Sequence, residues 1–236
     1  MISVIMPVYN GDKWIEDAIN SVLNQTYSNW ELFIINGAST DNTEVICKKF
    51  DDKRIHYVSV EYCEQVDKIN KGLRWCTGEY ISFLACDDSY HINFMDEMLK
   101  CLENHSEIDF VYSNQIIKTY GYNDKLLSEH PSDHGNLDCW EGYNKLFHTN
   151  HVGLFWLFRK HILSAVTIDQ PKYVKAWAWD WDFTLKVCEA GFKFMYLNKI
   201  LGTWRVHKSS YTGSNNQEHM DKLKKYCQNK ARERRK

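Results

Sequence analysis

The first 117 residues alternate between short apolar runs and stretches in which apolar residues recur at helical spacing. The strand-like runs cover residues 3–6, 30–35, 55–60, 80–86 and 110–117. Strands that alternate with helices usually pair in parallel, with the helices covering both faces of the sheet. The sequence therefore predicts an α/β fold built on a single, doubly wound, mostly parallel sheet flanked by helices.

Polar residues mark where the first helices are expected to begin. Asp12 precedes an apolar pattern over residues 14–23 and is the expected N-cap of that helix. Asp41 and Glu44 have the spacing of a capping box for the next helix. These acids are therefore assigned structural roles at helix starts.

Beyond residue 117 the periodicity weakens. Polar residues, Gly and Pro dominate residues 118–136, which predicts a long irregular segment of the kind that is often functional. The expected elements after it are an apolar strand at 152–158, a helix at 179–189, and short strands at 192–197 and 201–206. The Ser/Gly/Asn-rich residues 208–215 are typical of a mobile lid or linker.

The composition is that of a globular chain. With 236 residues, 44% of them hydrophobic, it can bury the core of one large domain with a C-terminal extension. No apolar run approaches the ~20 residues of a membrane-spanning helix, and the N-terminus enters a strand pattern without the features of a secretory signal. The eight cysteines show no CxxC pair, which indicates reduced thiols. We therefore expect a cytoplasmic protein.

Positive charge is concentrated at the C-terminus. Residues 222–236 hold eight Lys or Arg and one Glu, a net charge of +7, whereas the first 221 residues hold 21 basic and 30 acidic side chains. This tail has two interpretations. It is either a solvated terminal helix or a peripheral contact with an anionic membrane, to which each basic residue near the lipid contributes ~1 kcal/mol. We expect no nucleic-acid partner.

Two adjacent acids end the apolar run at residues 80–86. Asp87 and Asp88 would lie at the carboxyl end of a buried strand, where open α/β sheets bind their ligands. Paired carboxylates also suit a hard divalent cation, which prefers oxygen ligands. The alternative is a solvated turn, because Asp-Asp-Ser is common turn chemistry.

Short motifs follow one another in the expected order on these strands and loops. They are Val4-Ile-Met-Pro-Val-Tyr-Asn10, Ser39-Thr-Asp41, Asn70-Lys-Gly72 with Thr77-Gly-Glu-Tyr-Ile81, and Asp87-Asp88. Together they resemble the nucleotide-binding half of family 2 glycosyltransferases, which have the GT-A fold. Trp179-Asp180-Trp-Asp182 and Trp204-Arg-Val-His207 resemble the family's acid-containing helix start and its later histidine. The resemblance therefore extends, more loosely, to about residue 210.

The resemblance implies a GT-A domain over residues 1–210, with a nucleotide-binding half at 1–117 and a smaller acceptor-binding half at 118–210. A flexible loop and a basic helix would follow at 211–236. The implied reaction is inverting transfer of a sugar from a nucleoside diphosphate, expected to be UDP, to a hydroxyl of a growing glycan or glycolipid. The leaving diphosphate gathers negative charge, which a Mn²⁺ or Mg²⁺ ion can stabilise as a Lewis acid. Such chemistry belongs to polysaccharide biosynthesis.

The resemblance also assigns roles to the acids and to one histidine. Asp88 would hold the metal, Asp87 would bind the ribose, and Asp180 would remove the proton from the acceptor hydroxyl. Asp182 is the rival base, but side chains two residues apart on a helix diverge by roughly 200°, so only one of the two can face the site. Both acids could instead be helix N-terminal residues favoured by the helix dipole. His207 either completes the metal site or is an ordinary surface histidine.

Aromatic side chains and a second histidine are candidates for the sugar pocket. Trp179 and Trp181 could each stack on a sugar ring or pack in the core, and Trp177 is open to the same two interpretations. His151 could line the donor-sugar or acceptor pocket, or it could be a half-buried structural histidine.

The nucleotide is expected at the first turn, where Pro7, Tyr9 and Asn10 would place backbone groups against the base and ribose. One departure from the family pattern lies at the end of the second strand. Asn36 stands where family members commonly have Asp, and its oxygen accepts a hydrogen bond without the strength that a charge adds. We hypothesise that Asp67 supplies the missing acceptor.

Two other functions stay open at this point. Nucleotidyltransferases also place two carboxylates and a metal on an α/β sheet, but they need a basic, glycine-rich phosphate loop that residues 7–11 lack. The other is a catalytically silent nucleotide-sugar binding protein. Asn36 favours this second function mildly, whereas the retained acids Asp87, Asp88 and Asp180 argue against it.

Overall fold

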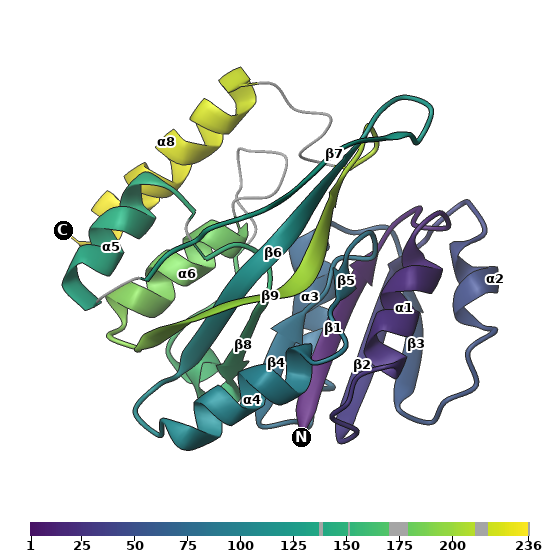
Figure 1. Cartoon of the computed structure of the whole chain (residues 1–236), viewed down its shortest axis with the longest axis horizontal. Helices are drawn as coiled ribbons and strands as arrows, with labels where there is room; N and C mark the ends of the chain where they lie inside the picture. Colours follow the sequence, from purple (N-terminus) through teal and green to yellow (C-terminus); the bar gives the residue numbers. More distant parts are fainter. Residues whose placement is uncertain (137–138, 151, 170–178, 211–216, 236) are drawn as a thin grey trace.

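The computed structural model describes residues 1–136, 139–150, 152–169, 179–210 and 217–235. Within these residues a nine-stranded sheet runs in the order β3-β2-β1-β4-β8-β6-β9-β5, and β7 pairs with β6 outside this path (Figure 1). Helices lie on both faces of the sheet. The predicted α/β class, with a single sheet flanked by helices, is confirmed.

The first four strands of the sheet are parallel. β1 (Ile2–Val8) lies between β2 (Trp30–Gly37) and β4 (Tyr80–Phe83), and β3 (Ile55–Val60) pairs with β2. Every residue of β1, β2 and β4 is buried, as expected for central strands of a parallel sheet that is covered on both faces. The carboxyl ends of these strands therefore meet at one edge of the sheet.

The second half of the sheet is mixed. β8 (Trp156–Arg159) runs antiparallel to β4 and to β6 (Phe110–Tyr120), β9 (Phe194–Val206) runs parallel to β6, and β5 (Ser89–Tyr90) runs antiparallel to β9. Four of the eight pairings among the described strands are parallel. The parallel arrangement thus dominates only in the first half, because an apolar strand pattern does not encode the direction of pairing.

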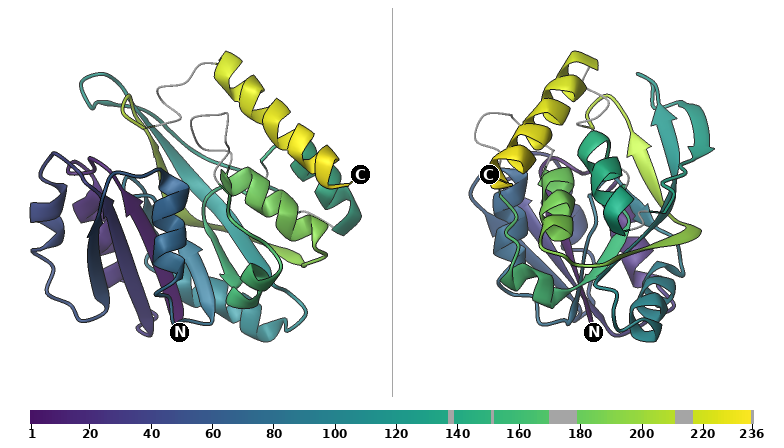
Figure 2. Two further views of the ribbon diagram at one scale, coloured as in Figure 1. Left: turned by 180° about the vertical axis from the view of Figure 1, so that it is seen from behind. Right: turned by 90° about the vertical axis from the view of Figure 1, so that its left-hand side faces the viewer.

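Helices cover the sheet through two hydrophobic clusters. The helices are α1 (Ile15–Leu23), α2 (Thr43–Cys47), α3 (Gln65–Leu73), α4 (Phe94–Asn104), α5 (Cys139–His148), α6 (Trp179–Glu189) and α8 (Gln217–Arg234), with a 3₁₀ helix at Lys160–Ser164. One cluster joins the sheet to α1 and α4, and the other joins it to α3 and α6. α5 and α8 pack against α6 and against each other (Figure 2). The C-terminal helix therefore belongs to the folded body of the molecule.

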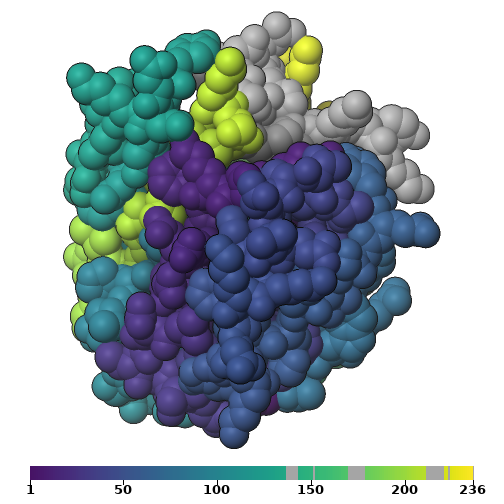
Figure 3. All heavy atoms as spheres, turned by 90° about the vertical axis from the view of Figure 1, so that its right-hand side faces the viewer, coloured from purple at the N-terminus to yellow at the C-terminus, as the bar shows by residue number. Residues whose placement is uncertain are grey.

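Residues 118–136 do not form the irregular segment that the sequence predicts. β6 continues to Tyr120, and β7 (Leu126–Pro131) returns antiparallel beside it, with Gly121 N donating to Lys125 O (2.9 Å) in the turn. Figure 3 shows this hairpin, in teal, projecting beside the purple and blue first part of the chain. Every residue of β7 is exposed, so the strand lacks the apolar alternation from which strands are predicted.

The predicted helix caps are wrong in detail. α1 begins after Trp14 and no side chain caps it, whereas Asp12 N donates to Asp41 Oδ2 (3.0 Å). Asp41 also accepts from Thr43 N (3.0 Å), and Asn42 occupies the cap position of α2. Asp12 and Asp41 thus join the first turn to the loop after β2, a contact that local sequence spacing does not reveal.

Other boundaries shift as well. The strand predicted at 80–86 ends at Phe83, and the two short strands predicted after Gly191 form the single long strand β9, which bridges the polar residues between them through irregularities in its register with β6. The helix predicted at 179–189 matches α6. Most of the predicted lid at 208–215 lies outside the described residues.

Candidate active site

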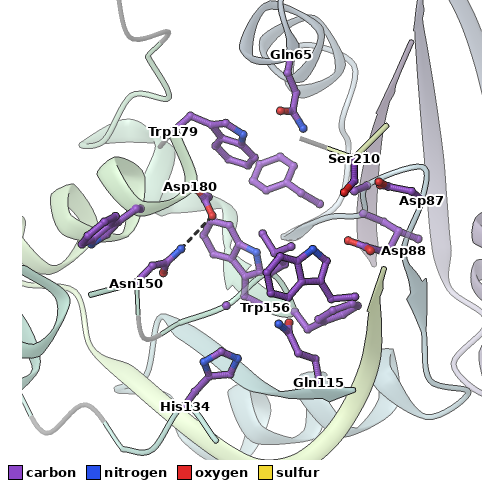
Figure 4. A pocket seen from close by; sticks show the side chains of 18 of the residues that line it. Gln65, Asp87, Asp88, Gln115, His134, Asn150, Trp156, Trp179, Asp180 and Ser210 are labelled. Atoms are coloured by element: carbon purple, nitrogen blue, oxygen red, sulfur yellow. Dashed lines mark hydrogen bonds between the residues drawn. The ribbon is translucent and has the colours of Figure 1, made fainter. Parts of the chain in front are cut away.

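A cavity of about 490 Å³ lies beyond the carboxyl ends of β1 and β4 (Figure 4). Its wall receives Pro7 from β1, the loop after β4, the segment before β8, the first turn of α6, and Lys224 of α8. Both halves of the chain therefore contribute to a single cavity. This placement agrees with the rule that open α/β sheets bind ligands at the carboxyl ends of their strands.

Asp87 and Asp88 line one side of the cavity. Asp88 is 2% exposed, and its Oδ1 accepts a hydrogen bond from Arg205 N (2.9 Å). Burial raises the pKa of Asp88 well above its usual range, and the neighbouring charge of Asp87 adds to this effect. Asp87 Oδ2 lies 3.2 Å from His207 Nε2, and Arg205 Nη1 donates to Asp87 O (3.0 Å). The end of β9 thus holds both acids in place.

The donor set at this point fits a divalent cation that is shared with a ligand. Asp87 and Asp88 are adjacent, Asp88 is buried, and the imidazole of His207 lies against Asp87. A nearby cation stabilises buried acids of like charge. The described residues hold no cluster of three acidic, His or Cys side chains arranged as a complete metal site. Mg²⁺ is commonly bound in this way, by one or two carboxylates with substrate phosphates supplying further oxygens.

Asp180 lines the opposite side of the cavity, in the first turn of α6 (Figure 4). Burial raises its pKa to about 6, although hydrogen bonds from the backbone and from Asn150 oppose this shift. Asn150 Nδ2 donates to Asp180 Oδ2 over 3.0 Å. A carboxylate with a pKa of about 6 can accept a proton more readily than an ordinary aspartate near neutral pH.

Asp182 does not reach the cavity. Its Oδ1 accepts from Arg234 Nη1 of α8 (2.8 Å), and its Oδ2 lies 3.1 Å from Lys186 Nζ. Asp180 therefore lines the cavity, whereas Asp182 is paired with two cationic side chains. This geometry agrees with the expectation that only one of the two acids can face the site.

The two tryptophans that flank Asp180 are both buried parts of the cavity wall. Trp179 packs against Phe83 and Trp156, with ring centroids 5.4 and 6.2 Å away. Trp181 Nε1 donates to Leu146 O (2.5 Å). These contacts are those of core side chains, so both rings are held by protein. His151 and Trp177 lie outside the described residues.

The first turn lies beside the cavity and is tied to the loop after β2. Asn10 adopts a left-handed conformation (φ 53°), its N donates to Ser39 Oγ, and its Oδ1 accepts from Thr40 N, both over 2.8 Å. Pro7 lines the cavity, whereas Tyr9 is 45% exposed and packs edge-on against Tyr62. The exposed ring of Tyr9 and the hydrogen-bonded backbone of Asn10 therefore follow closely on Pro7 at the cavity wall.

Asn36 uses its polar atoms within the protein. It is 1% exposed, its Nδ2 donates to Tyr57 OH (2.7 Å), and its Oδ1 accepts from both Ser39 N and Ser39 Oγ. Because a carbonyl oxygen has two lone pairs, the Asn36 oxygen has no capacity left for a nucleobase in this conformation. Asp67 is exposed in the first turn of α3 and does not line the cavity.

Sequence reasoning missed several polar residues of the wall. Gln65 of α3, Gln115 of β6, His134 and Asn150 all line the cavity (Figure 4). Gln115 gave a usable signal, because it is a polar residue inside the apolar run that is predicted as a strand at 110–117. The others follow no local pattern and depend on how distant segments meet.

Comparisons with known proteins agree on one family. The model of the family described as Glycosyl transferase family 2 matches residues 3–166. A glucosyltransferase of Escherichia coli, named UDP-Glc:alpha-D-GlcNAc-diphosphoundecaprenol beta-1,3-glucosyltransferase WfgD, is 36% identical over 118 residues, which are 50% of this chain and 46% of that protein. Glycosyltransferase GlyA of Streptococcus pneumoniae is 27% identical over 89% of this chain and 31% of its own length. The chain thus spans about half or less of these relatives.

Solved structures show the same fold. TarS of S. aureus in complex with UDP-GlcNAc superposes with a TM-score of 0.72 at 20% identity, over 94% of this chain and 65% of that chain. The mannosyltransferase PcManGT of Pyrobaculum calidifontis, in complex with GDP-Man and Mn2+, gives a TM-score of 0.64 at 19% identity, over 90% of this chain and 59% of that chain. The predicted GT-A fold is confirmed. Among the helices that the structure describes, none is long and apolar enough to cross a bilayer.

Proposed function

Because the chain belongs to glycosyltransferase family 2, we propose that it is an inverting, metal-dependent enzyme that transfers a sugar from a nucleoside diphosphate to a hydroxyl of a glycan or a lipid-linked acceptor. UDP is the expected nucleotide, since TarS binds UDP-GlcNAc and the name of WfgD specifies UDP-glucose. In this proposal residues 1–117 bind the nucleotide and residues 118–210 bind the acceptor.

The observation that carries the proposal is Asp180, a single buried carboxylate across the cavity from Asp87 and Asp88. An inverting transfer needs one base, placed on the side of the sugar opposite to the leaving group. Asp180 would accept the proton of the acceptor hydroxyl, and Asn150 would hold its carboxylate in position. Its raised pKa of about 6 keeps it largely ionised at pH 7 while making it a stronger base than a solvated aspartate.

Asp88 and His207 would hold a Mn²⁺ or Mg²⁺ ion together with the diphosphate, and the ion would supply Lewis-acid stabilisation of the leaving group.

Asp87 would bind the ribose, in keeping with its greater exposure. Pro7, Tyr9 and Asn10 would present the first turn to the nucleotide. Because Asn36 Oδ1 already accepts two hydrogen bonds, another group would have to accept the N–H of the base. Asp67 would need a change in conformation to do so.

The enzyme and the silent binding protein are separated by turnover. The protein should be incubated with Mn²⁺ or Mg²⁺ and a panel of UDP-, GDP- and dTDP-sugars, and release of the nucleoside diphosphate should be measured. We expect release that depends on the metal and is lost in Asp88→Ala. Binding of a nucleotide sugar without turnover for any donor or metal would contradict the proposal and favour a binding protein.

The stereochemistry provides a second test. The anomeric configuration of the product, determined by NMR, should be opposite to that of the donor. Retention would exclude a mechanism that has Asp180 as its single base.

We also propose a cytoplasmic location with peripheral contact to an anionic membrane. Lys222, Lys225 and Arg232 are exposed on α8, the helix that also brings Lys224 to the cavity. A lipid-linked acceptor would then reach the cavity from the membrane side. Co-sedimentation with vesicles of anionic and neutral lipid tests this, and equal binding to both would contradict it.

A further inference from the structure

Gln115 of β6 is a buried polar side chain to which the proposed reaction assigns no role. It is 2% exposed, it lines the cavity, and its buried side-chain oxygen Oε1 has no hydrogen-bond partner among the residues that the structure describes. Buried polar groups in folded proteins are nearly always hydrogen-bonded, because leaving one without a partner costs folding free energy. Such an amide in the wall of a ligand cavity indicates that its partner is the ligand.

The neighbouring residue shows that the strand can satisfy its other polar groups. Asn114 Nδ2 donates to Tyr196 OH (2.6 Å), and Asn114 Oδ1 accepts from His134 N (2.9 Å). The backbone of Gln115 is also paired, since its N donates to Ser132 Oγ (3.0 Å) and its O accepts from Ser132 N (2.8 Å). The unpaired polar group of Gln115 is therefore in its side chain and not in its backbone.

The protein fixes this side chain by close packing. Gly153 has a positive φ of +66°, and a Cβ added there would lie 2.5 Å from His134 Nε2 and 3.3 Å from Gln115 Oε1. A side chain at position 153 would therefore compete with Gln115 and His134 for the same space. The glycine lets the segment before β8 approach them closely, which limits the positions that the amide can take.

Gln115 also stands at the right place for the sugar that is transferred. Figure 4 shows Gln115 on the cavity wall near His134, with Asp180 and Asn150 to one side of it and Asp87 and Asp88 to the other. In an inverting transfer the transferred sugar lies between the leaving diphosphate and the base. A side chain on the wall between these groups would lie next to that sugar.

We propose that Gln115 hydrogen-bonds a polar substituent of the transferred sugar and thereby selects the donor. This inference rests on the proposed function and adds to it a specificity-determining residue. An amide has both a donor and an acceptor, as a sugar hydroxyl does, so the two groups are complementary. A buried group that must be paired rejects a donor that lacks the matching hydroxyl far more strongly than an apolar wall would.

The test is Gln115→Met, which keeps the length of the side chain and removes its polar atoms. Affinities for UDP, UDP-glucose, UDP-galactose and UDP-GlcNAc should be measured by calorimetry in the presence of Mn²⁺. We expect unchanged affinity for UDP and a loss of about ten- to a hundredfold for the sugar nucleotide that the wild type binds best. The melting temperature without ligand should stay the same or rise, because an unpaired buried amide is removed.

Monodeoxy analogues of the best donor identify the partner group. One of these analogues should bind the wild type more weakly than the parent donor does. The same analogue and the parent donor should bind Gln115→Met with equal affinity. Gln228→Met, which removes the glutamine amide that donates to Phe147 O outside the cavity, is the control and should leave all four affinities unchanged.

The outcomes separate the two proposals. Wild-type protein that binds none of the nucleotides would overturn the proposed function and this inference with it. Wild-type protein that binds a UDP-sugar with the same affinity as Gln115→Met would overturn this inference alone. A Gln115→Met variant that melts at a lower temperature and loses as much affinity for UDP as for the UDP-sugar would show a structural role instead.

Discussion

At the scale of single residues, surroundings decide what chemically identical groups do. Asp180 and Asp182 lie in the first turn of the same helix and are both nearly buried. Asp180 faces the cavity with a neutral amide as its side-chain partner, so burial raises its pKa to about 6. Asp182 is paired with Arg234 and Lys186. The same residue type therefore supplies a candidate base at one position and an ion pair at the other.

Asp180→Asn should lower the activity and raise the stability of the protein. Burial raises the Asp180 pKa from 3.8 to about 6, so the charged form destabilises the folded protein above pH 6 and this cost disappears below pH 3.8. We expect the variant to be more stable than wild type by roughly 1–3 kcal/mol at pH 7.5, with kcat lower by at least about 100-fold. Urea unfolding at pH 7.5 and pH 5 measures the first effect, and the gain should be smaller at pH 5.

The wild-type pH profile gives an independent check on Asp180. Activity should fall as the pH decreases through about 6, because protonated Asp180 cannot act as a base. UDP affinity measured without metal serves as the control, because Asp180 takes no part in it. A rate that is flat from pH 5 to pH 8 would contradict the assignment.

Asp182→Asn should show the opposite pattern. Removing the carboxylate leaves Arg234 and Lys186 without this partner, and because Arg234 is partly exposed we expect a loss of about 1–2 kcal/mol rather than the full cost of a buried pair. Turnover of a saturating donor should stay within a few-fold of wild type. Loss of turnover with unchanged stability would instead identify Asp182 as the base.

At the scale of elements, α8 connects the charged tail to the candidate active site. Cys227 and Ala231 are fully buried against α5 and α6, and Arg234 pairs with Asp182 and Glu189 of α6. The same helix brings Lys224 to the cavity. Burial of the apolar side together with ion pairs at the end of the helix explains why a basic terminal sequence is docked on the domain.

Arg234→Met should loosen this docking. The variant loses both ion pairs with α6 but keeps a long apolar side chain, so we expect a loss of about 1 kcal/mol in unfolding free energy and faster hydrogen exchange in α8. Lys230→Met is the matched control, because its ion pair with Glu233 lies within α8. Equal exchange in both variants would show that these pairs do not hold the helix.

At the scale of the whole molecule, one buried carboxylate joins three separate segments of the parallel half. Glu31 of β2 accepts hydrogen bonds from Ser3 Oγ of β1 (2.5 Å), Thr77 N (2.6 Å) and Gly78 N (3.2 Å). Burial acts to raise the Glu31 pKa, but the hydrogen bonds outweigh it and the pKa is lowered overall. The Thr77-Gly78 part of the recognised motif is thus explained by folding rather than by ligand binding.

Glu31→Gln should destabilise the fold at neutral pH by about 1–3 kcal/mol, because the charged acceptor of several hydrogen bonds is lost. A lowered pKa means that the stabilisation is fully present above the unfolded value of 4.5 and is lost as the pH falls further, through the lowered pKa of the folded state. The difference between variant and wild type in urea unfolding should therefore stay constant from pH 7 to pH 5 and shrink only below pH 4.5. Glu16→Gln, at an exposed position of α1, is the control and should change little.

The sequence predicted most of the parallel half and singled out three acids that line the cavity, and it missed what depends on contacts between distant segments. The strands at β1 to β3 and the helix α6 could be predicted because their apolar periodicity is local. β7 could not, since its residues are exposed and it is held to β6 by backbone pairing and the Lys118–Glu129 ion pair rather than by buried apolar side chains. Asp12 and Asn36 were assigned other roles because their partners, Asp41 and Tyr57, are 29 and 21 residues away.

By itself the sequence determined the α/β class, the family resemblance and the position of Asp87, Asp88 and Asp180 along the chain. These depend on short-range patterns of apolar and acidic residues, which are written in the order of the chain. Only the tertiary structure decided that Asp180 and not Asp182 faces the cavity, that the Asn36 side-chain oxygen already accepts two hydrogen bonds, and that the Gln115 side-chain oxygen is buried without a partner among the described residues. Burial and hydrogen-bond pairing depend on which segments meet, and local sequence does not carry that information.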